Sequence, residues 1–186
     1  MFAKKVVDAM KEGKIIRLKP EDYDQCRNIW DMSKHPLTQK WYKELISGNR
    51  IIFVYQLDGE FAGEGALVFN TGDSHYTILN KRLYLSRLIV KENYCSQEIA
   101  TVLLEYLILY AHQLGFSEVS VGVDCDNQEA WSLYKKMGFI NVLFHGNDEQ
   151  GGCQTVKKSL NIMQKGALLS SRPLFDGYVI DESELA

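Results

Sequence analysis

The chain has no long apolar run and no surplus of positive charge. No stretch of its 186 residues approaches the roughly 20 uninterrupted apolar residues that span a bilayer, so no transmembrane helix is expected. Its 21 Lys and Arg residues are outnumbered by 24 Asp and Glu residues, which gives a net charge of -3. Because nucleic-acid binding depends on neutralising phosphates, this composition predicts no nucleic-acid partner.

Neither a signal peptide nor a metal site is expected. The first 14 residues, MFAKKVVDAMKEGK, are charged throughout and lack the apolar core of a signal peptide, so a cytoplasmic location is expected. The four cysteines, at positions 26, 95, 125 and 153, do not have metal-ligand spacing. No His, Cys and Asp cluster indicates a metal site, and no Ser, His and Asp set indicates a hydrolase. Free reduced thiols and no bound metal are therefore expected.

The chain does have the length and apolar content of one packed domain. Its residues are 46% hydrophobic and 24% charged, which is typical of a globular protein. We expect this domain over residues 1–160. Residues 161–186 have little periodicity and an acidic end, and are expected to form a loosely ordered extension. The alternative is that Phe175, Tyr178 and Ile180 dock on this domain or on a neighbouring chain, as in a homodimer.

Hydrophobic periodicity and turn residues predict alternating strands and helices. After a short leading helix over 3–12, strands are expected at 15–18, 51–56, 61–69, 82–90, 118–123, 140–144 and 153–160. Asp126 is placed to cap a late helix, with Glu129 in capping-box position, and Gly115 ends the longest helix. The predicted helices are 21–32, 37–46, 96–114 and 127–137.

Three segments carry recognisable motifs. The first is Leu85-Ser-Arg-Leu-Ile-Val90, followed by Tyr94-Cys-Ser-Gln-Glu-Ile-Ala100. The second, NQEAWSLYKKMGF from Asn127 to Phe139, reads N-x-x-A-x-x-L-Y-x-x-x-G-F, and the third is Ile15 to Asp22. Together they resemble the acyl-CoA motif, the downstream segment and the opening strand of the GNAT N-acetyltransferases. The resemblance implies an α+β fold of the three-layer sandwich type, with a mixed, mostly antiparallel sheet and helices on both faces.

The resemblance places the pyrophosphate of acetyl-CoA at a helix N-terminus, where free N–H groups and a partial positive charge suit an anion. The family pattern starts with Arg or Gln and contains glycines, and only Ala100 keeps it here. Either the backbone amides bind without those side chains, or an inward-pointing Glu98 weakens the binding. The residues concerned are Cys95, Ser96, Gln97, Glu98, Ile99, Ala100 and Thr101.

The resemblance implies three further roles. Backbone groups of Leu88, Ile89 and Val90 would pair with the pantetheine arm, although their side chains also read as core residues. Tyr134 would donate a proton to the departing CoA thiolate, although its helical spacing alone indicates a packed aromatic. Asn127 would contact pantetheine or the acyl carbonyl, or simply serve as an amide at a strand–helix junction.

The general base is less well defined by the sequence. Attack on a thioester needs a neutral amine, so a base must remove a proton, often through water. Glu64 is the first candidate, and Asp124 and His75 are alternatives, although each also reads as a solvated surface residue. Arg87 is expected either to bind an acidic group of the substrate or to pair with Glu64.

We therefore expect an enzyme that moves an acetyl group from acetyl-CoA directly to a primary amine of a small molecule or peptide. Trp30, Trp41 and Tyr42, on the helices 21–32 and 37–46, are predicted to wall the acceptor side. One alternative is a catalytically weakened acyl-CoA-binding or regulatory module. Another is an interaction scaffold that uses residues 161–186.

Overall fold

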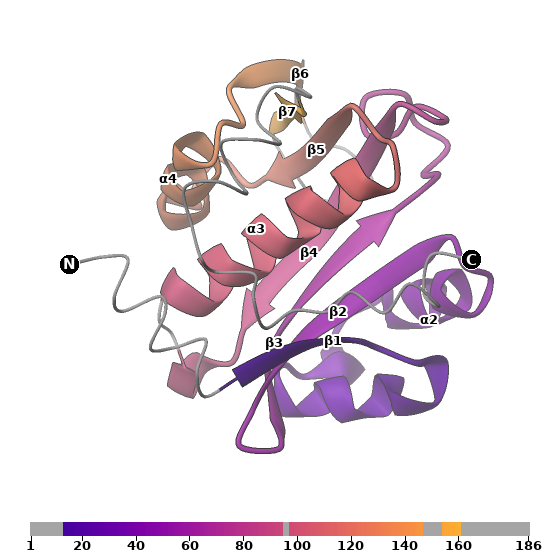
Figure 1. Ribbon diagram of the computed structural model, residues 1–186, viewed down its shortest axis with the longest axis vertical. Coiled ribbons are helices and arrows are strands. Elements are labelled where there is room, and N and C mark those ends of the chain that lie inside the picture. The colour runs from indigo at the N-terminus through magenta and orange to yellow at the C-terminus, as the bar shows by residue number, and fades with distance from the viewer. Residues whose placement is uncertain (1–12, 95–96, 147–153, 161–186) are drawn as a thin grey trace.

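The computed structural model describes residues 13–94, 97–146 and 154–160 (Figure 1). The predicted helix 3–12 and the extension 161–186 lie outside the described residues. The strands are β1 Gly13–Arg17, β2 Arg50–Leu57, β3 Glu60–Val68, β4 Arg82–Val90, β5 Glu118–Val123, β6 Asn141–His145 and β7 Gln154–Ser159. The helices are η1 Pro20–Asn28, η2 Met32–Lys34, α2 Thr38–Ile46, η3 Glu92–Tyr94, α3 Gln97–Gln113 and α4 Gln128–Lys136, where η marks a 3-10 helix.

One mixed sheet runs through the molecule. Its seven strands lie in the order β1-β2-β3-β4-β5-β7-β6. Every neighbouring pair is antiparallel except β4 and β5, which run parallel. A parallel pair needs a crossover connection, and α3 provides it by passing over the sheet (Figure 1). The predicted mixed, mostly antiparallel sheet is confirmed.

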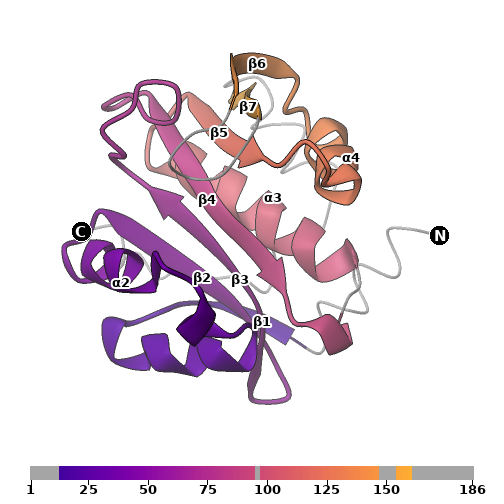
Figure 2. The same ribbon diagram turned by 180° about the vertical axis from the view of Figure 1, so that it is seen from behind.

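Helices cover both faces of this sheet. α3 packs on one face, where Leu104 and Leu107 are fully buried against apolar residues of the central strands (Figure 1). Gly65 on β3 permits this close approach, because a Cβ there would lie 2.4 Å from Leu107 Cδ1. On the opposite face, η1 and α2 contribute Tyr23 and Trp41 to a second apolar cluster (Figure 2). The result is the predicted three-layer sandwich.

The helix predicted over 21–32 is present but is divided into two and is of the 3-10 type. The chain forms a 3-10 helix over Pro20–Asn28, followed by the short 3-10 helix η2. The buried residues Tyr23, Cys26 and the capping residue Ile29 are spaced three apart. A 3-10 helix has three residues per turn, so this spacing aligns all three side chains with the sheet.

The predicted cap of α4 is wrong by one residue. Asn127 is the N-cap, and its side-chain oxygen accepts a hydrogen bond from the Ala130 N–H at 3.0 Å. Asp126 lies one residue before the cap, so its side chain does not take this role. The end of α3 agrees with the prediction, because Gly115 has a φ of +87°, a left-handed conformation that glycine adopts without strain.

The cysteines correct a further expectation. Cys26 is a buried free thiol, but Cys125 is disulfide-bonded to a partner outside the described residues. The expectation of reduced thiols is therefore wrong for Cys125, since spacing along a chain does not reveal which distant residues meet. In the part of the chain that the structure describes, no group of three or more His, Cys, Asp or Glu residues is placed to hold a metal ion. None of the described helices is both long and apolar enough to cross a membrane.

Candidate active site

β4 and β5 separate part-way along their length. Their parallel pairing covers only Arg82–Leu85 of β4 and ends opposite Val121, after which β5 pairs only with β7. β4 continues to Val90, and residues 86–90 are partly exposed. No described strand pairs with this edge of β4 beyond Leu85. Its backbone N–H and C=O groups are therefore placed like those of an edge strand, where a ligand can add hydrogen bonds.

A β-bulge in β4 accompanies the separation. In the ladder with β3, Ala66 pairs with Arg87 and Leu67 pairs with Leu85, which leaves Ser86 as an extra residue. A bulge bends its strand and increases the local twist, which gives a physical reason for β4 to leave β5 here. Sequence analysis missed the bulge. The available signal was Ser86-Arg87, two consecutive polar residues in an otherwise apolar run.

A buried arginine holds the bulge from the η1 and α2 side. Arg50, at the start of β2, is 3% exposed and donates a hydrogen bond from Nη2 to Ser86 Oγ at 3.0 Å. The same Nη2 lies 2.9 Å from Glu44 Oε2 of α2, and the guanidinium lies 5.2 Å from the Trp41 ring centroid. One fixed guanidinium thus connects α2, β2 and the bulge. No motif in the sequence indicated Arg50.

The residues predicted to pair with pantetheine follow the bulge directly. Leu88 and Val90 pack on the α3 side of the sheet, whereas Ile89 packs toward η1 and α2. Their side chains therefore contribute to both cores. The backbone edge of β4 is the part of these residues that remains for a ligand.

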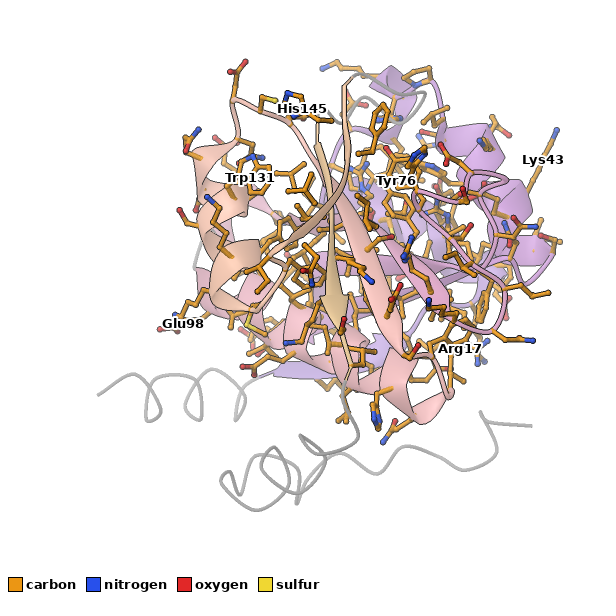
Figure 3. The ribbon with its side chains drawn as sticks, turned by 90° about the horizontal axis from the view of Figure 1, so that it is seen from above. Arg17, Lys43, Tyr76, Glu98, Trp131 and His145 are labelled. Atoms are coloured by element: carbon orange, nitrogen blue, oxygen red, sulfur yellow. The ribbon has the colours of Figure 1, made fainter. Side chains whose placement is uncertain are left out.

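The start of α3 lies directly after β4 and η3. Ile99 is 5% exposed and packs in the core beneath the helix. Glu98 is partly exposed, and Figure 3 shows its side chain at the periphery of the molecule, pointing outward. A carboxylate in the first helical turn interacts favourably with the helix dipole. Of the other residues predicted for this loop, Ala100 and Thr101 are partly buried, and Cys95 and Ser96 lie outside the described residues.

Tyr134 of α4 is buried in the same core as the end of β5. It is 6% exposed, and its ring contacts the edge of Phe139 at a centroid distance of 5.6 Å. Its hydroxyl has no hydrogen-bond partner among the described residues. Burial raises the pKa of Tyr134 well above its ordinary value. Burial and then the Tyr134 hydroxyl raise the pKa of Tyr84 on β4, so the two hydroxyls lie within electrostatic range.

The other predicted polar residues, Asn127, Asp124 and His75, lie in two separate parts of the structure. Asn127 and Asp124 lie between β5 and α4, where both are exposed. The Asn127 oxygen is used by the helix cap, and its NH₂ group remains for a ligand. His75 lies in the loop before β4, with Nδ1 2.8 Å from Asp73 and its ring 5.0 Å from Phe144 of β6. The structure brings Asp124 and Asn127 together but places His75 against β6.

Glu64 and Arg87 form an ion pair on the η1 and α2 side of the sheet. Glu64 is 2% exposed, and its Oε1 lies 2.7 Å from Arg87 Nε. The two atoms form an ion pair but not a hydrogen bond, because the angle at the Nε–H is unfavourable. The predicted pairing of Arg87 with Glu64 is therefore confirmed, and Glu64 is not a solvated surface residue. Its Oε2 is buried without a hydrogen-bond partner in the described chain. Burial and then the Glu64 charge raise the pKa of the neighbouring Cys26 thiol far above its usual range.

Aromatic side chains enclose the Arg87 guanidinium. Its Cζ lies 3.7 Å from the Trp30 ring centroid and 5.0 Å from that of Trp41. His35 completes the group, with ring centroids 4.4 Å from Trp41 and 5.9 Å from Trp30. Burial and then the Arg87 charge lower the pKa of His35, so this imidazole is neutral near pH 7. Trp30 and Trp41 thus meet at β4, one residue beyond the bulge.

A comparison with known protein families identifies the family of this chain. Residues 15–139, more than half of the chain, match the acetyltransferase (GNAT) family. The chain belongs to the GNAT acetyltransferase family. Family membership makes it an acetyl-CoA-dependent N-acetyltransferase, as the sequence motifs predicted. No curated protein sequence matches it.

Solved structures of other acetyltransferases share the GNAT fold of this chain. The PaiA N-acetyltransferase of Thermoplasma acidophilum, solved with coenzyme A, is 19% identical with a TM-score of 0.59, over 79% of this chain and 98% of its own. The ribosomal-protein-S18-alanine N-acetyltransferase of Escherichia coli is 19% identical with a TM-score of 0.61, over 81% and 95%. Aminoglycoside 6'-acetyltransferase type Ii is 18% identical with a TM-score of 0.60, over 80% and 97%. At these identities the likeness establishes the fold alone.

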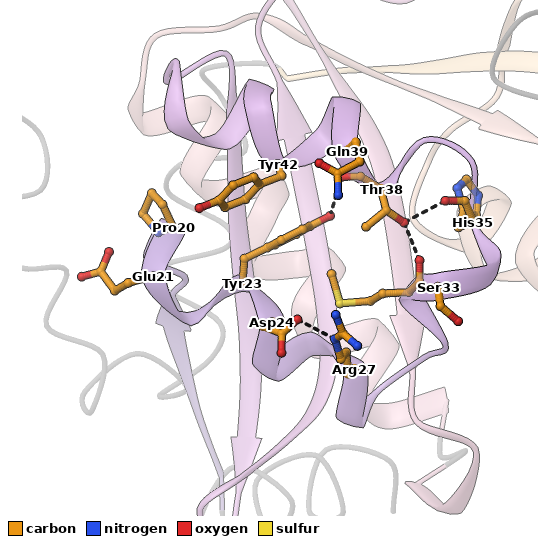
Figure 4. Close-up of a pocket in the computed structure, with 11 residues that line it drawn as sticks. Pro20, Glu21, Tyr23, Asp24, Arg27, Ser33, His35, Thr38, Gln39 and Tyr42 are labelled. Atoms are coloured by element: carbon orange, nitrogen blue, oxygen red, sulfur yellow. Dashed lines mark hydrogen bonds and ion pairs between the residues drawn. The ribbon is translucent and has the colours of Figure 1, made fainter.

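Tyr42, the third residue predicted for the acceptor wall of this GNAT protein, lines a groove between η1 and α2 (Figure 4). Its ring stacks on Tyr23 at 5.4 Å, and the Tyr23 hydroxyl donates to the Thr38 carbonyl at 3.4 Å. The groove has a volume of about 470 Å³, and its described lining comes from η1, η2, α2 and their connections. Because His35 also lines it, the groove adjoins the aromatic group around Arg87 from the outside.

Proposed function

We propose that this GNAT enzyme transfers an acetyl group from acetyl-CoA directly to a primary amine, with the chemistry at the point where β4 leaves β5. The observation that carries the proposal is the unpaired edge of β4 beyond Leu85, beside a buried tyrosine hydroxyl with no described partner. The acceptor is a small-molecule or peptide amine. Its reacting nitrogen approaches from the η1 and α2 side, opposite α3.

Backbone groups supply the proposed coenzyme site. The free edge of β4 at Leu88, Ile89 and Val90 accepts an extended amide chain as it would accept another strand. The first N–H groups of α3, over 97–101, are proposed to bind the diphosphate, together with the predicted residues Cys95 and Ser96, which lie outside the described residues. Because the Glu98 side chain points outward, salt screens its charge from that anion. The site therefore does not depend on the glycines of the family pattern.

Tyr134 is proposed to act on the leaving thiolate. Its raised pKa keeps the hydroxyl protonated at neutral pH, as a donor must be. The same shift makes it a weak acid. We therefore assign Tyr134 first a hydrogen bond to the developing negative charge on sulfur, and then delivery of the proton as the C–S bond breaks. The Asn127 NH₂ group, which the helix cap does not use, is proposed to contact pantetheine or the acyl carbonyl.

Glu64 is proposed as the general base, acting through water. Its unpartnered Oε2 accepts the proton that the attacking amine loses, while Oε1 stays with Arg87. A C–N bond forms at the thioester carbonyl, the C–S bond breaks, and the two protons move from amine to Glu64 and from Tyr134 to sulfur. Backbone amides at the bulge polarise the carbonyl. Asp124 and His75 remain alternative bases.

Calorimetric titration with acetyl-CoA and an assay of CoA release on a panel of primary amines test this function. We expect micromolar binding and turnover that depends on the amine. Tight binding without turnover on any amine would instead support the regulatory module with weakened chemistry. Amide signals of α3 and β4 that stay unshifted in an NMR titration with saturating acetyl-CoA would reject the function altogether.

A further inference from the structure

We propose that Arg87 binds a carboxylate of the acceptor, which makes the acceptor an amine that also carries an acid group, such as an amino acid. This inference rests on the proposed acetyl transfer and specifies its substrate class. It goes beyond that function because the contact with Glu64 uses only the Nε side of Arg87, which leaves Nη1 and Nη2 for a ligand.

The position of Arg87 relates it to the reaction centre. It follows the bulge residue Ser86 directly, on the unpaired half of β4. Its side chain leaves the sheet toward η1 and α2, opposite the face that α3 covers. In an α-amino acid, the carboxylate lies two bonds from the amino nitrogen. A carboxylate held by Arg87 therefore keeps that nitrogen close to the bulge, where the thioester carbonyl is proposed to lie.

The guanidinium is already fixed before any ligand arrives. Trp30 stacks on it at 3.7 Å and Glu64 contacts its Nε at 2.7 Å, so little side-chain entropy is lost on binding. No hydrogen bond from Nη1 or Nη2 to any described residue is present, and 15% of the side chain is exposed. These two nitrogens present the parallel N–H pair that a carboxylate binds in bidentate fashion.

The surroundings of Arg87 are rich in donors. The Trp30 Nε1–H is buried without an acceptor in the described chain. His35 Nδ1 accepts a hydrogen bond from the Leu37 N–H at 3.2 Å, so the neutral ring carries its proton on Nε2 as a further donor. Buried donors without acceptors are costly, and a ligand that supplies oxygen atoms removes that cost.

The charges on this side of the sheet are balanced before a ligand binds. Glu64 offsets Arg87, and Glu44 offsets Arg50. A carboxylate bound at the outer edge of Arg87 thus gains a charge-assisted contact, while an acceptor without that group leaves the same N–H groups unpaired. A site built on such donors rejects an analogue that lacks the matching group.

The test uses matched pairs of acceptors, each an amino acid and the amine left by its decarboxylation. Three pairs differ in the size of the side chain: alanine and ethylamine, leucine and isopentylamine, and phenylalanine and phenethylamine. With acetyl-CoA, we expect the wild-type protein to prefer the acid by at least about tenfold in kcat/KM for the pair that fits. Arg87→Met should lower kcat/KM for both acceptors, because it leaves the Glu64 base without its partner, and should reduce the ratio of acid to matched amine from at least about tenfold to about one.

Two further variants distinguish loss of the carboxylate contact from a general disturbance of the fold. Arg87→Lys keeps the charge beside Glu64 but not the planar pair of donors, so an intermediate preference is expected. Arg17→Met makes the same substitution as Arg87→Met on the edge strand β1 and should leave the preference unchanged. Calorimetry provides a readout that needs no turnover. In the presence of CoA, it compares the dissociation constants of two acetylated products, N-acetylphenylalanine and N-acetylphenethylamine.

The outcomes separate this inference from the function beneath it. Turnover of amines with no preference for the acids, or equal or absent binding of the two acetylated products, overturns the role of Arg87 and leaves acetyl transfer standing. Failure of acetyl-CoA itself to bind overturns the proposed function. A preference for the acid that survives in Arg87→Met also overturns the assignment, because another group would then hold the carboxylate.

Discussion

Arg50 donates a hydrogen bond to Ser86, the one residue of β4 that the β3 ladder skips. The bond joins a buried cation, anchored to α2 through Glu44, to the place where β4 leaves β5. The bulge is therefore fixed by a side chain from two strands away. Its shape is set by the packing of η1 and α2 as well as by β4 itself.

Ser86→Ala should lower kcat by about three- to tenfold while changing KM for acetyl-CoA little, because it removes one hydrogen bond and leaves the Arg50 donor unpaired. Steady-state kinetics together with thermal unfolding measure both effects. Ser47→Ala, at the exposed end of α2, is the matched control. Unchanged kcat in Ser86→Ala would show that the bulge keeps its shape without this bond.

Tyr134→Phe should lower kcat by about 100-fold, within the range usual for loss of a general acid, with acetyl-CoA affinity retained. The ring and its contact with Phe139 are kept, so stability should change little. Single-turnover kinetics and calorimetry separate the chemical step from binding. Tyr76→Phe, which removes another buried hydroxyl without a hydrogen-bond partner in the described chain, is the control. Undiminished turnover in Tyr134→Phe would remove the acid assignment.

Glu98→Gln should change the dissociation constant of acetyl-CoA by less than about twofold at physiological salt, because an outward carboxylate is screened. Calorimetric titrations at low and physiological ionic strength provide the measurement. A tenfold tightening would mean that the carboxylate turns toward the pyrophosphate, and the alternative of weakened binding would then gain support. Glu105→Gln, further along α3, controls for the change in net charge.

Alkaline pH should destabilise the fold through its buried tyrosines. Burial is the main cause that raises the pKa of Tyr23, Tyr84 and Tyr134 above the ordinary value of 10.0. A raised folded-state pKa means that this stability is fully present below pH 10 and is lost as pH rises through the folded values. Urea unfolding at about pH 8 and about pH 11 should show the fall. A Tyr23→Phe and Tyr84→Phe double variant should flatten it, and an unaltered slope would contradict the assignment.

Much of the architecture followed from local pattern. The alternation in Glu118–Val123 and the apolar stripe of α3 predicted their elements within a residue or two. The failures lie where tertiary contacts decide. η1 is a 3-10 helix because Tyr23 and Cys26 must both face the sheet, and the partner of Cys125 depends on which segments meet in space.

The proposed site could be predicted from the sequence only where it rests on motifs. Tyr134 and the edge of β4 were reached through the resemblance to GNAT proteins, and the pairing of Glu64 with Arg87 followed from neighbouring strands. Arg50 and Ser86 were missed because their contact joins residues 36 positions apart and belongs to no motif. The burial of Glu64 was missed because a single glutamate between glycines reads as surface.

The extra residue at Ser86 also reverses the alternation of β4. Leu83 and Leu85 face α3, and so does Leu88, at an odd spacing that an unbroken strand would not allow. Removing Ser86 would shorten the spacing from Leu85 to Leu88 to two residues, so Arg87 would stay on the η1 and α2 side while the strand lost its bulge. A single-codon deletion at Ser86 should therefore keep both apolar cores in place and remove the bend, whereas a deletion elsewhere in this strand would exchange the two sides of its remainder.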